Sequence, residues 1–494
     1  MSDNNQSSYR SIFKATSLFG GVQVYQILIQ IIKSKIIAVL LGPAGVGIIG
    51  LYQSSLQLVQ SISSMGLAQS GVRDVSEANG TGDLERISKI VTVVRKLVWF
   101  TGLLGTIAVI VLSPILSRTS FGNYDYTIPF IFLSATLFLD QLSAGQKIVL
   151  QGLRRLKDLA KVTAIGQTLG LIVSIPFYYW LGIKGIVPTL ILTSVCSLII
   201  SWLYSRKVKI SKVQITRKQT FEQGRMMLVM GISMSLSAVF ATAASYVIRS
   251  FIQGVGGVEE VGLFQAGFVI MNTYVGLITS AIATDYYPRL AAINKDNNKC
   301  REVVCQQGEI ASFILTPMLV ICLVFMPYVL RLLYSDQFLR ANDYITWACL
   351  GMFLRLGSWL ISFLFVAKAE SKLFIINELV ASGEYLAFSI LGYWLWGLKG
   401  IGIAFAFSYL VYFIQVYLIA HYRYNFSFNK SFVSHYSIQI CLICMCLISV
   451  LVFRTIPKYV VGIVLIIISI VYCFWGLNKR IDIVNLAKTR LHRR

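Results

Sequence analysis

The segment Gly182-Ile-Lys-Gly-Ile186 recurs later in the chain as Gly397-Leu-Lys-Gly-Ile401, and each copy opens an apolar run close after a tryptophan. The offset between the copies is 215 residues. Further matches keep this offset: Gly42 over Gly257, and Val46-Gly47 over Val261-Gly262. A shared offset in separate blocks indicates an internal repeat rather than chance similarity between glycine-rich helix starts. We therefore expect two copies of one structural unit.

The composition is that of a membrane protein. Of the 494 residues, 56% are hydrophobic and 13% are charged, whereas soluble domains have roughly 45–50% apolar and about 25% charged residues. This excludes a water-soluble enzyme, a disordered chain and a disulfide-rich secreted fold. The length instead fits a dozen or more membrane-spanning helices of about 20 residues each.

A hydropathy window of about 19 residues predicts fourteen spans. They are 15–41, 45–70, 97–117, 127–150, 160–181, 185–204, 226–251, 261–287, 308–331, 342–367, 372–396, 399–420, 436–454 and 457–477. Each repeat then holds six helices, an even number, so both copies have the same orientation. We expect an all-α polytopic fold with two six-helix lobes, at 1–210 and 211–421, followed by two appended helices and a basic tail at 422–494.

The charge pattern gives the topology. The chain carries 44 Lys and Arg against 21 Asp and Glu, a net charge of +23. In a soluble protein such an excess would suggest nucleic-acid binding. Here the connections between spans are alternately rich and poor in basic residues, so that one side of the membrane carries roughly four times as many as the other. Basic connections lie on the cytoplasmic side, so we expect both termini in the cytoplasm and no nucleic-acid partner. The N-terminus is polar and predicts no cleaved signal.

Motifs for metal binding and catalysis are missing from the sequence. Cys441, Cys444 and Cys446 have metal-like spacing but lie in an apolar run with no histidine nearby. The sequence has no nucleotide-binding Gly-x4-Gly-Lys-Ser/Thr loop, no His-Glu-x-x-His and no Gly-x-Ser-x-Gly. The external connections are short and leave no room for a catalytic domain. We expect no metal, no cofactor and no enzymatic activity.

Polar side chains at helical spacing form stripes on three predicted helices. The stripes are Gln23, Gln26, Gln30 and Lys33; Gln53, Gln57, Gln60 and Ser64; and Gln265, Asn272 and Thr279, followed by Asp285. Such stripes can line a wet cavity between two helical bundles, or they can form hydrogen bonds between helices. Three stripes together favour the cavity.

Ionisable residues inside a span are costly and usually functional. Lys33, Lys35 and Arg355 fall within spans, and at the 215-residue offset Asp140 corresponds to Arg355. One hypothesis is that these two pair in one conformation, while an anionic substrate competes for Arg355 in another; the alternative is a permanent structural pair. Arg249 at the outer end of its helix is either an interface anchor or a ligand. Asp140 and Asp285 are the candidates for gating or ion coupling.

Three short motifs resemble one family. Leu41-Gly-Pro-Ala-Gly-Val-Gly47, Val261-Gly-Leu-Phe-Gln265 and Tyr286-Tyr-Pro-Arg-Leu290 are similar to motifs of the O-antigen translocases. These are Wzx-type flippases of the multidrug/oligosaccharidyl-lipid/polysaccharide (MOP) superfamily. The resemblance implies a V-shaped fold with a cationic lumen in a bacterial inner membrane. It also implies transfer of an undecaprenyl-diphosphate-linked oligosaccharide to the outer leaflet by alternating access.

The resemblance carries further expectations and leaves alternatives. Lys33, Arg249 and Arg355 are the candidate lumen cations, and a polysaccharide polymerase complex is an expected partner beside the substrate and membrane lipid. Without a nucleotide site, an ion gradient, the membrane potential or substrate gradients would drive transport. The alternatives are a multidrug and toxin extrusion antiporter, which would favour buried carboxylates, and a membrane-embedded glycan polymerase or ligase.

Overall fold

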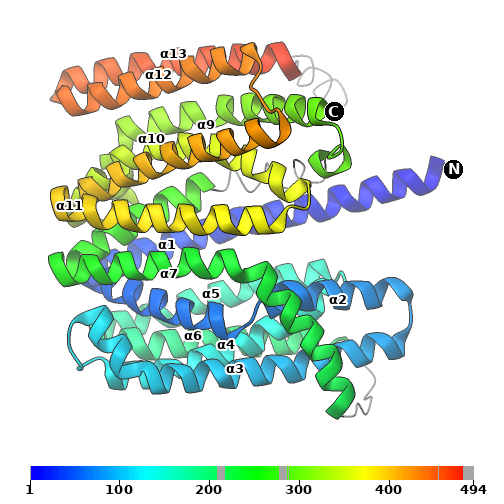
Figure 1. Ribbon diagram of the computed structural model, residues 1–494. Helices are drawn as coiled ribbons and strands as arrows, with labels where there is room; N and C mark the ends of the chain where they lie inside the picture. Colours follow the sequence, from blue (N-terminus) through cyan, green and yellow to red (C-terminus); the bar gives the residue numbers. More distant parts are fainter. Residues whose placement is uncertain (1, 209–216, 277–285, 287–288, 454, 482–494) are drawn as a thin grey trace. The chain divides into compact units, whose positions relative to one another are not determined.

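The computed structural model describes residues 2–208, 217–276, 286, 289–453 and 455–481. These residues form helices joined by short connections and contain no strand (Figure 1). The chain divides into two compact units, Met1–Gly262 and Leu263–Arg494. The all-α class expected from the composition is therefore confirmed. The lobe limits derived from the repeat stay a prediction.

The first unit contains six α-helices and the larger part of a seventh. They are α1 (Ser2–Ser63), α2 (Leu67–Thr81), α3 (Leu84–Phe121), α4 (Thr127–Gly152), α5 (Leu156–Leu181) and α6 (Ile186–Ser205), with the short 3-10 helix η1 (Gly182–Gly185) before α6. The seventh, α7 (Arg217–Val269), runs past the end of this unit. Helix α4 packs against α3 and α6, and α5 packs against α6 and α1.

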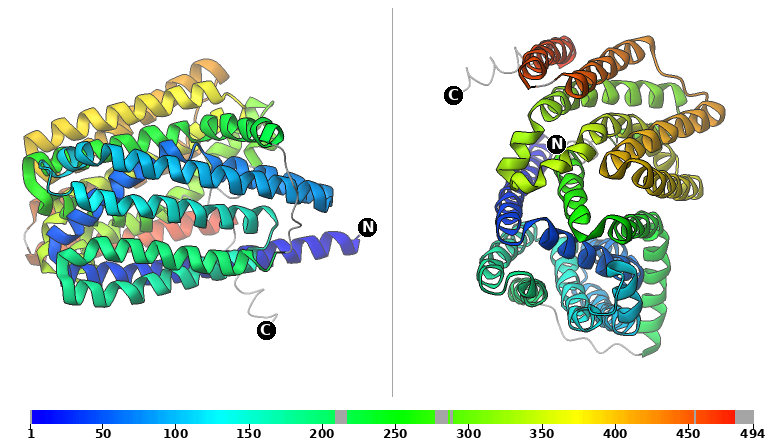
Figure 2. Two further views of the ribbon diagram at one scale, coloured as in Figure 1. Left: turned by 90° about the horizontal axis from the view of Figure 1, so that it is seen from below. Right: turned by 90° about the vertical axis from the view of Figure 1, so that its left-hand side faces the viewer.

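The second unit begins within α7 and continues through a π-helical turn, η2 (Ile270–Val275). Its further elements are α9 (Asn297–Leu333), η3 (Asp336–Ala341), α10 (Asn342–Ala367), α11 (Ser371–Tyr424), α12 (Lys430–Val452) and α13 (Thr455–Ile481). Helix α10 packs against α11, and α9 packs against α10, α12 and α13. In the right-hand view of Figure 2 the helices are seen almost end-on, and within each unit they form a bundle.

Four glycines interrupt the helices at positions that obey the repeat. Gly42 (φ 63°, ψ −169°) corresponds to Gly257 (φ 82°, ψ 177°), and Gly182 (φ 55°, ψ −131°) corresponds to Gly397 (φ 59°, ψ −140°). A positive φ is readily adopted only by glycine, because other residues bring Cβ against the carbonyl oxygen. The internal repeat read from the sequence is therefore present in the backbone.

The ends of α4 and α10 repeat a geometry that the residue types do not reveal. Both helices have 26 residues, and their bounds differ by the repeat offset. After α4, Arg154 has a φ of 55° and the Arg155 N–H donates to Leu150 O at 2.8 Å; after α10, Ala369 has a φ of 59° and the Glu370 N–H donates to Phe365 O at 3.0 Å. This is the Schellman termination, which usually has glycine at the left-handed position.

The starts of α3 and α9 are matched as well. The Asp83 side chain accepts from the backbone N–H groups of Glu85 and Arg86, and the Asp296 side chain accepts from those of Asn298 and Lys299. Each carboxylate satisfies N–H groups that have no partner inside the helix. These two caps are 213 residues apart, two fewer than the repeat offset.

The lengths of the helical segments are consistent with the number of membrane crossings predicted from the sequence. Ten described helical segments are long and apolar enough to span a bilayer. Four of them have 43 to 54 residues: Gly21–Ser63, Leu156–Ser205, Glu222–Thr273 and Ser371–Tyr424. At 1.5 Å per residue each is at least about twice as long as the ~30 Å hydrocarbon core, and each contains one of the four glycine breaks. Counted as two crossings each, they are consistent with the predicted fourteen.

Two repeat-related glycines let α1 and α7 cross at backbone contact within the first unit. A Cβ at Gly47 would lie 2.0 Å from Val258 O, and a Cβ at Gly262 would lie 1.9 Å from Pro43 O. Pro43 and Val258 are themselves separated by the repeat offset, so the crossing is symmetric. Only glycine permits such an approach, as in other closely packed membrane helices.

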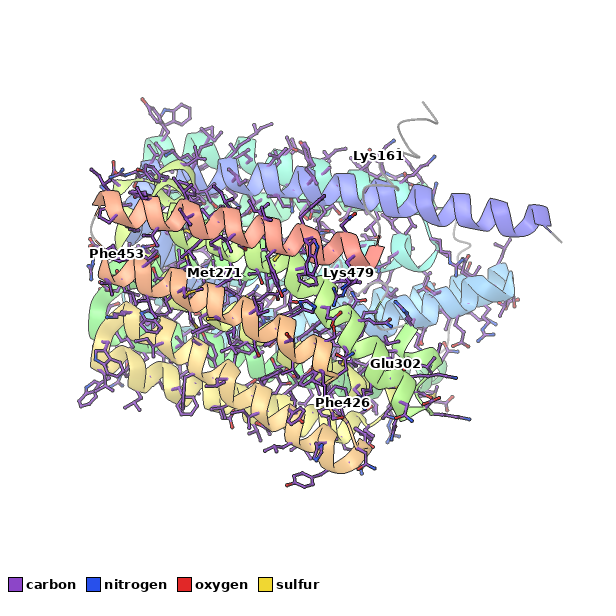
Figure 3. The ribbon with its side chains drawn as sticks, turned by 90° about the horizontal axis from the view of Figure 1, so that it is seen from above. Lys161, Met271, Glu302, Phe426, Phe453 and Lys479 are labelled. Carbon is purple, nitrogen blue, oxygen red and sulfur yellow. The ribbon has the colours of Figure 1, made fainter. Side chains whose placement is uncertain are left out.

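The second unit has two distinct ends. Figure 3 shows Phe453, which follows α12, at one end of the unit, and Glu302, Phe426 and Lys479 toward the other. The predicted topology assigns Phe453 to the outside and the other three residues to the cytoplasmic side. The structure thus places together the residues that the charge pattern assigns to one side, while the orientation of the termini stays a prediction.

Candidate functional site

The first unit contains a polar cavity of about 250 Å³ between α1, α4, α5 and α6. Its charged side chains are Lys33 on α1 and Lys147 on α4. The neutral polar side chains that line it are Gln30, Thr163, Gln167, Thr193 and Ser197. Both lysines belong to segments long and apolar enough to span a membrane, where an ammonium group is costly unless it faces water or a ligand.

Neither lysine has a carboxylate oxygen at salt-bridge distance in the part of the chain that the structure describes. Lys147 does interact electrostatically with Asp140, two turns earlier on α4. Asp140 also interacts with the Ser194 hydroxyl on α6. The surroundings of the cavity therefore hold two positive charges and one negative charge.

Lys147 is a functional candidate that sequence analysis missed. Because it lies near the end of a predicted span, the sequence prediction counted it among the basic residues that flank a cytoplasmic connection. The spacing Asp140, Ser143, Lys147 places the three on one face of α4, and this face points to α6: the Ser143 hydroxyl is 3.2 Å from that of Ser197. That spacing was the available signal.

A second polar cluster lies inside the second unit around Arg355. Its Nη1 donates to Asn272 Oδ1 at 2.6 Å, and its guanidinium lies 5.5 Å from the centre of the Tyr409 ring. Asn272 belongs to η2, a π-helical turn of the kind often found at functional sites. Two residues predicted separately for substrate binding are thus in contact.

The cluster extends to a carboxylate on α11 that the sequence analysis did not select. Tyr412 donates to Glu378 Oε1 and accepts at 3.2 Å from Asn377, which in turn accepts at 2.6 Å from Gln415. Asn377 and Tyr412 are buried. Glu378 interacts electrostatically with Arg355 without forming a salt bridge among the residues described. Glutamate is rare within apolar spans, so the residue type itself was the available signal in the sequence.

The two clusters occupy equivalent positions in the repeat. Asp140 and its partner Ser194 correspond, at the 215-residue offset, to Arg355 and Tyr409, which also contact each other. In the same way Thr163 corresponds to Glu378 and Ser197 to Tyr412. Each half thus carries a polar cluster at the same place in its bundle, with different charges. The hypothesis that Asp140 pairs with Arg355 joins residues of different units and stays a prediction.

The remaining predicted residues have separate surroundings. Gln53 and Gln57 are exposed along α1, and Gln26 and Gln265 are partly buried. Arg249 is 5% exposed, and its guanidinium donates to the carbonyl and hydroxyl oxygens of Ser245 one turn earlier. Asp285 lies outside the described residues. The roles of these residues in binding and coupling stay predictions.

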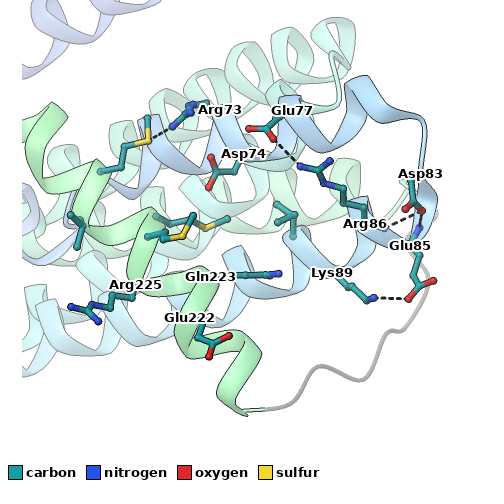
Figure 4. A pocket seen from close by; sticks show the side chains of 15 residues that line it. Arg73, Asp74, Glu77, Asp83, Glu85, Arg86, Lys89, Glu222, Gln223 and Arg225 are labelled. Carbon is teal, nitrogen blue, oxygen red and sulfur yellow. Dashed lines mark hydrogen bonds and ion pairs between the residues drawn. The ribbon is translucent and has the colours of Figure 1, made fainter.

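A larger pocket of about 1110 Å³ lies between α2 and the N-terminal parts of α3 and α7 (Figure 4). Its charges largely compensate one another: Arg86 pairs with Glu77 at 2.8 Å, and Lys89 with Glu85 at 2.6 Å. Arg73 contacts the Met230 sulfur atom, and burial raises the pKa of the neighbouring Asp74 carboxyl. This pocket therefore lacks the excess of positive charge found around Lys33 and Lys147.

Within the described ranges, no group of three or more His, Cys, Asp or Glu side chains could hold a metal ion. The three cysteines with metal-like spacing differ in environment: Cys441 is exposed, Cys444 is partly buried and Cys446 is buried.

Comparison with known proteins relates this fold to transporters. Residues 36–343 match the polysaccharide biosynthesis protein family. The lipid III flippases of Escherichia coli (strain K12) and Shigella flexneri are each 21% identical over 417 residues, covering 82% of this chain and 96% of theirs.

Solved structures of the MOP superfamily share the fold. An inward-facing multidrug resistance MATE family transporter aligns with a TM-score of 0.68 at 17% identity, covering 82% of this chain and 94% of its own. A lipid II flippase in an inward closed conformation aligns with a TM-score of 0.66 at 12% identity, covering 96% of this chain and all of its own. These relatives are flippases and transporters, which confirms the prediction of a non-enzymatic membrane protein. The chain belongs to the polysaccharide biosynthesis protein family and has the fold of the MOP superfamily.

Proposed function

We propose that this protein is a flippase that moves a lipid-linked oligosaccharide from the cytoplasmic to the outer leaflet of a bacterial inner membrane. The observation that carries the proposal is that Lys33, Lys147 and Arg355 lie in polar clusters inside the spanning helices. None of them forms a salt bridge with a described residue. Such charges are retained in a membrane when they serve an anionic ligand or a charge pathway.

Arg355 is suited to a phosphate group. A guanidinium has five N–H donors in a planar fork that matches phosphate oxygens. Only Nη1 of Arg355 donates to an oxygen of the described residues, the Oδ1 atom of Asn272. The other donors leave capacity for an anion, and the nearby Tyr409 and Gln415, which are partly exposed, can bind sugar hydroxyls or water. A diphosphate-linked sugar needs such polar surroundings, because its unaided passage through hydrocarbon is prohibitive.

The relatives support a lipid-linked substrate, since lipid II and lipid III flippases are among them. We infer that the lipid is undecaprenyl diphosphate, that the sugar is an O-antigen or similar surface-polysaccharide repeat unit, and that a polymerase complex receives it. We further infer alternating access driven by an ion gradient or the membrane potential, with both termini in the cytoplasm.

The alternative of a multidrug extrusion antiporter fits the charges less well. Organic cations would favour carboxylates without a basic neighbour, whereas Asp140 interacts with Lys147 and Glu378 with Arg355. MATE transporters share the fold, and this likeness at 17% identity supports the architecture rather than their substrates.

Deletion of the gene in its host tests the proposal. We expect complete diphosphate-linked repeat units to accumulate on the inner leaflet and surface polysaccharide to be lost, with recovery on expression of the wild type. Arg355→Gln should restore little, whereas Lys161→Gln, which removes an exposed cation on α5, should restore fully. Units that reach the outer leaflet unpolymerised would instead indicate a polymerase. Normal glycan with sensitivity to cationic drugs would indicate the antiporter.

A further inference from the structure

We propose that the cavity between α1, α4, α5 and α6 binds an acidic sugar of the transported oligosaccharide, with Lys33 and Lys147 holding its carboxylate. This inference rests on the proposed function, and it concerns the sugar rather than the diphosphate. The cavity lies wholly within the first unit, and both ammonium groups line it.

The charge of the cavity matches a single carboxylate. Lys33 and Lys147 contribute two positive charges, and Asp140 interacts electrostatically with Lys147. Counted with their ordinary charges, the two lysines and the neighbouring Asp140 sum to +1, which one carboxylate neutralises and a diphosphate would overcompensate. The type of cation agrees, because lysine acts as a compact point charge, whereas the planar fork that selects phosphate is that of arginine. Arg355, the arginine of the polar clusters, belongs to the other unit.

The neutral lining suits sugar hydroxyls. The Thr163 hydroxyl donates to Leu159 O at 2.8 Å and that of Thr193 donates to Leu190 O at 2.8 Å. Their donor hydrogens are therefore used, and their oxygens remain as acceptors for a hydroxyl of the ligand. Gln30 and Gln167 line the same cavity, and each amide supplies both donors and acceptors.

The size of the cavity fits one sugar unit. Its volume of about 250 Å³ lies just below the range of about 300–1,000 Å³ found for pockets of drug-sized ligands. Gly166 keeps one wall open, since a Cβ at this position would meet no atom within 4 Å. A whole oligosaccharide does not fit, so we assign the cavity to one acidic unit of the chain.

Binding of simple sugars to the purified full-length protein tests the assignment without requiring transport. The probes are a methyl glucuronoside, the corresponding neutral methyl glucoside and inorganic phosphate, titrated by calorimetry at constant ionic strength. Because hydrogen bonds to charged groups are the stronger ones, we expect the glucuronoside to bind about tenfold or more tightly than the glucoside. Inorganic phosphate should compete weakly.

Variants connect the preference to the two lysines. In Lys33→Gln with Lys147→Gln, the preference for the glucuronoside should disappear while weak glucoside binding persists. Lys161→Gln removes an exposed cation from the same helix as Thr163 and should keep the preference. Lys147→Arg, which retains the charge, should keep most of it. A preference that survives the double substitution, or phosphate that displaces the bound glucuronoside at an equal concentration, would overturn the assignment.

The natural substrate provides a second test that separates this inference from the proposed function. Lipid-linked oligosaccharide that accumulates on gene deletion can be analysed by mass spectrometry, and we expect an acidic sugar in the repeat unit. Accumulation of a wholly neutral oligosaccharide on the inner leaflet would refute the acidic-sugar subsite and leave the flippase assignment intact. No accumulation at all would refute the flippase assignment, whereas the sugar-binding titration would still decide on the cavity.

Discussion

The symmetric crossing of α1 and α7 predicts a specific destabilisation on substitution of one glycine. In Gly262→Ala the new Cβ would lie 1.9 Å from Pro43 O, whereas ordinary contact begins at 3.4 Å. The two backbones must therefore separate by about 1.5 Å, and overpacking of this kind costs about 1–3 kcal/mol. Alanine regains about 1 kcal/mol through its helix propensity. Gly254→Ala is the matched control, because it lies on the same helix and a Cβ there meets nothing within 4 Å.

The assay is thermal unfolding of the purified full-length protein, followed by tryptophan fluorescence at a fixed scan rate. The propensity gain cancels between the two variants, so Gly262→Ala should be less stable than Gly254→Ala by the full overpacking cost of about 1–3 kcal/mol. Gly47→Ala should behave like Gly262→Ala, because its Cβ would lie 2.0 Å from Val258 O. Once the helices have separated, a second methyl group fits, so the double variant should lose less than the sum of the singles. Strict additivity, or a Gly262→Ala variant as stable as Gly254→Ala, would refute the reasoning.

Other predictions concern single interactions. Arg355→Lys keeps the charge but loses the planar fork, so the KM for flipping in proteoliposomes should rise about tenfold; an unchanged KM would count against phosphate binding there. Glu309 is 6% exposed and pairs with Arg480 at 2.5 Å, so Arg480→Met should cost about 3–5 kcal/mol, and adding Glu309→Gln should restore part of it. If the double variant is less stable than Arg480→Met alone, the unpaired charge of Glu309 is not the cause of the lost stability. The Lys299 backbone N–H lowers the pKa of Asp296 below its usual 3.8. The stability from this cap is therefore complete above about pH 4 and lost as the pH falls through the lowered pKa; Asp296→Asn should flatten this part of the pH–stability curve, and a curve identical to wild type would contradict the role of the cap.

The repeat and the helix breaks could be predicted because they depend on glycine, which the sequence displays directly. Gly42, Gly182, Gly257 and Gly397 supply the left-handed backbone at the four breaks. The left-handed residues that end α4 and α10, Arg154 and Ala369, could not be predicted, because neither residue type favours a positive φ. At Ala369 the surrounding helix ends impose the conformation through the Glu370 hydrogen bond.

The candidate site was predicted only in part, because the sequence shows helical faces and not distances between helices. Asn272 and Arg355 were selected on separate helices, and their contact at 2.6 Å depends on tertiary packing. Lys147 was assigned to topology, since a basic residue near the end of a span has the same appearance whether it snorkels to the surface or points into a cavity. Glu378 was overlooked within an apolar run.

The caps at Asp83 and Asp296 show that the spacing of equivalent elements differs locally between the two halves. They stand two residues short of the 215-residue period, yet the period holds at Gly42 before them and is regained at Thr127, where α4 begins as α10 does at Asn342. The segment from the first break to the cap is therefore two residues longer in the first half than in the second, and the segment from the cap to α4 is two residues shorter. If the halves descend from one duplicated gene, gaps have been retained in compensating pairs. An uncompensated two-residue deletion in α3 would move its capped end by about 3 Å along the helix axis.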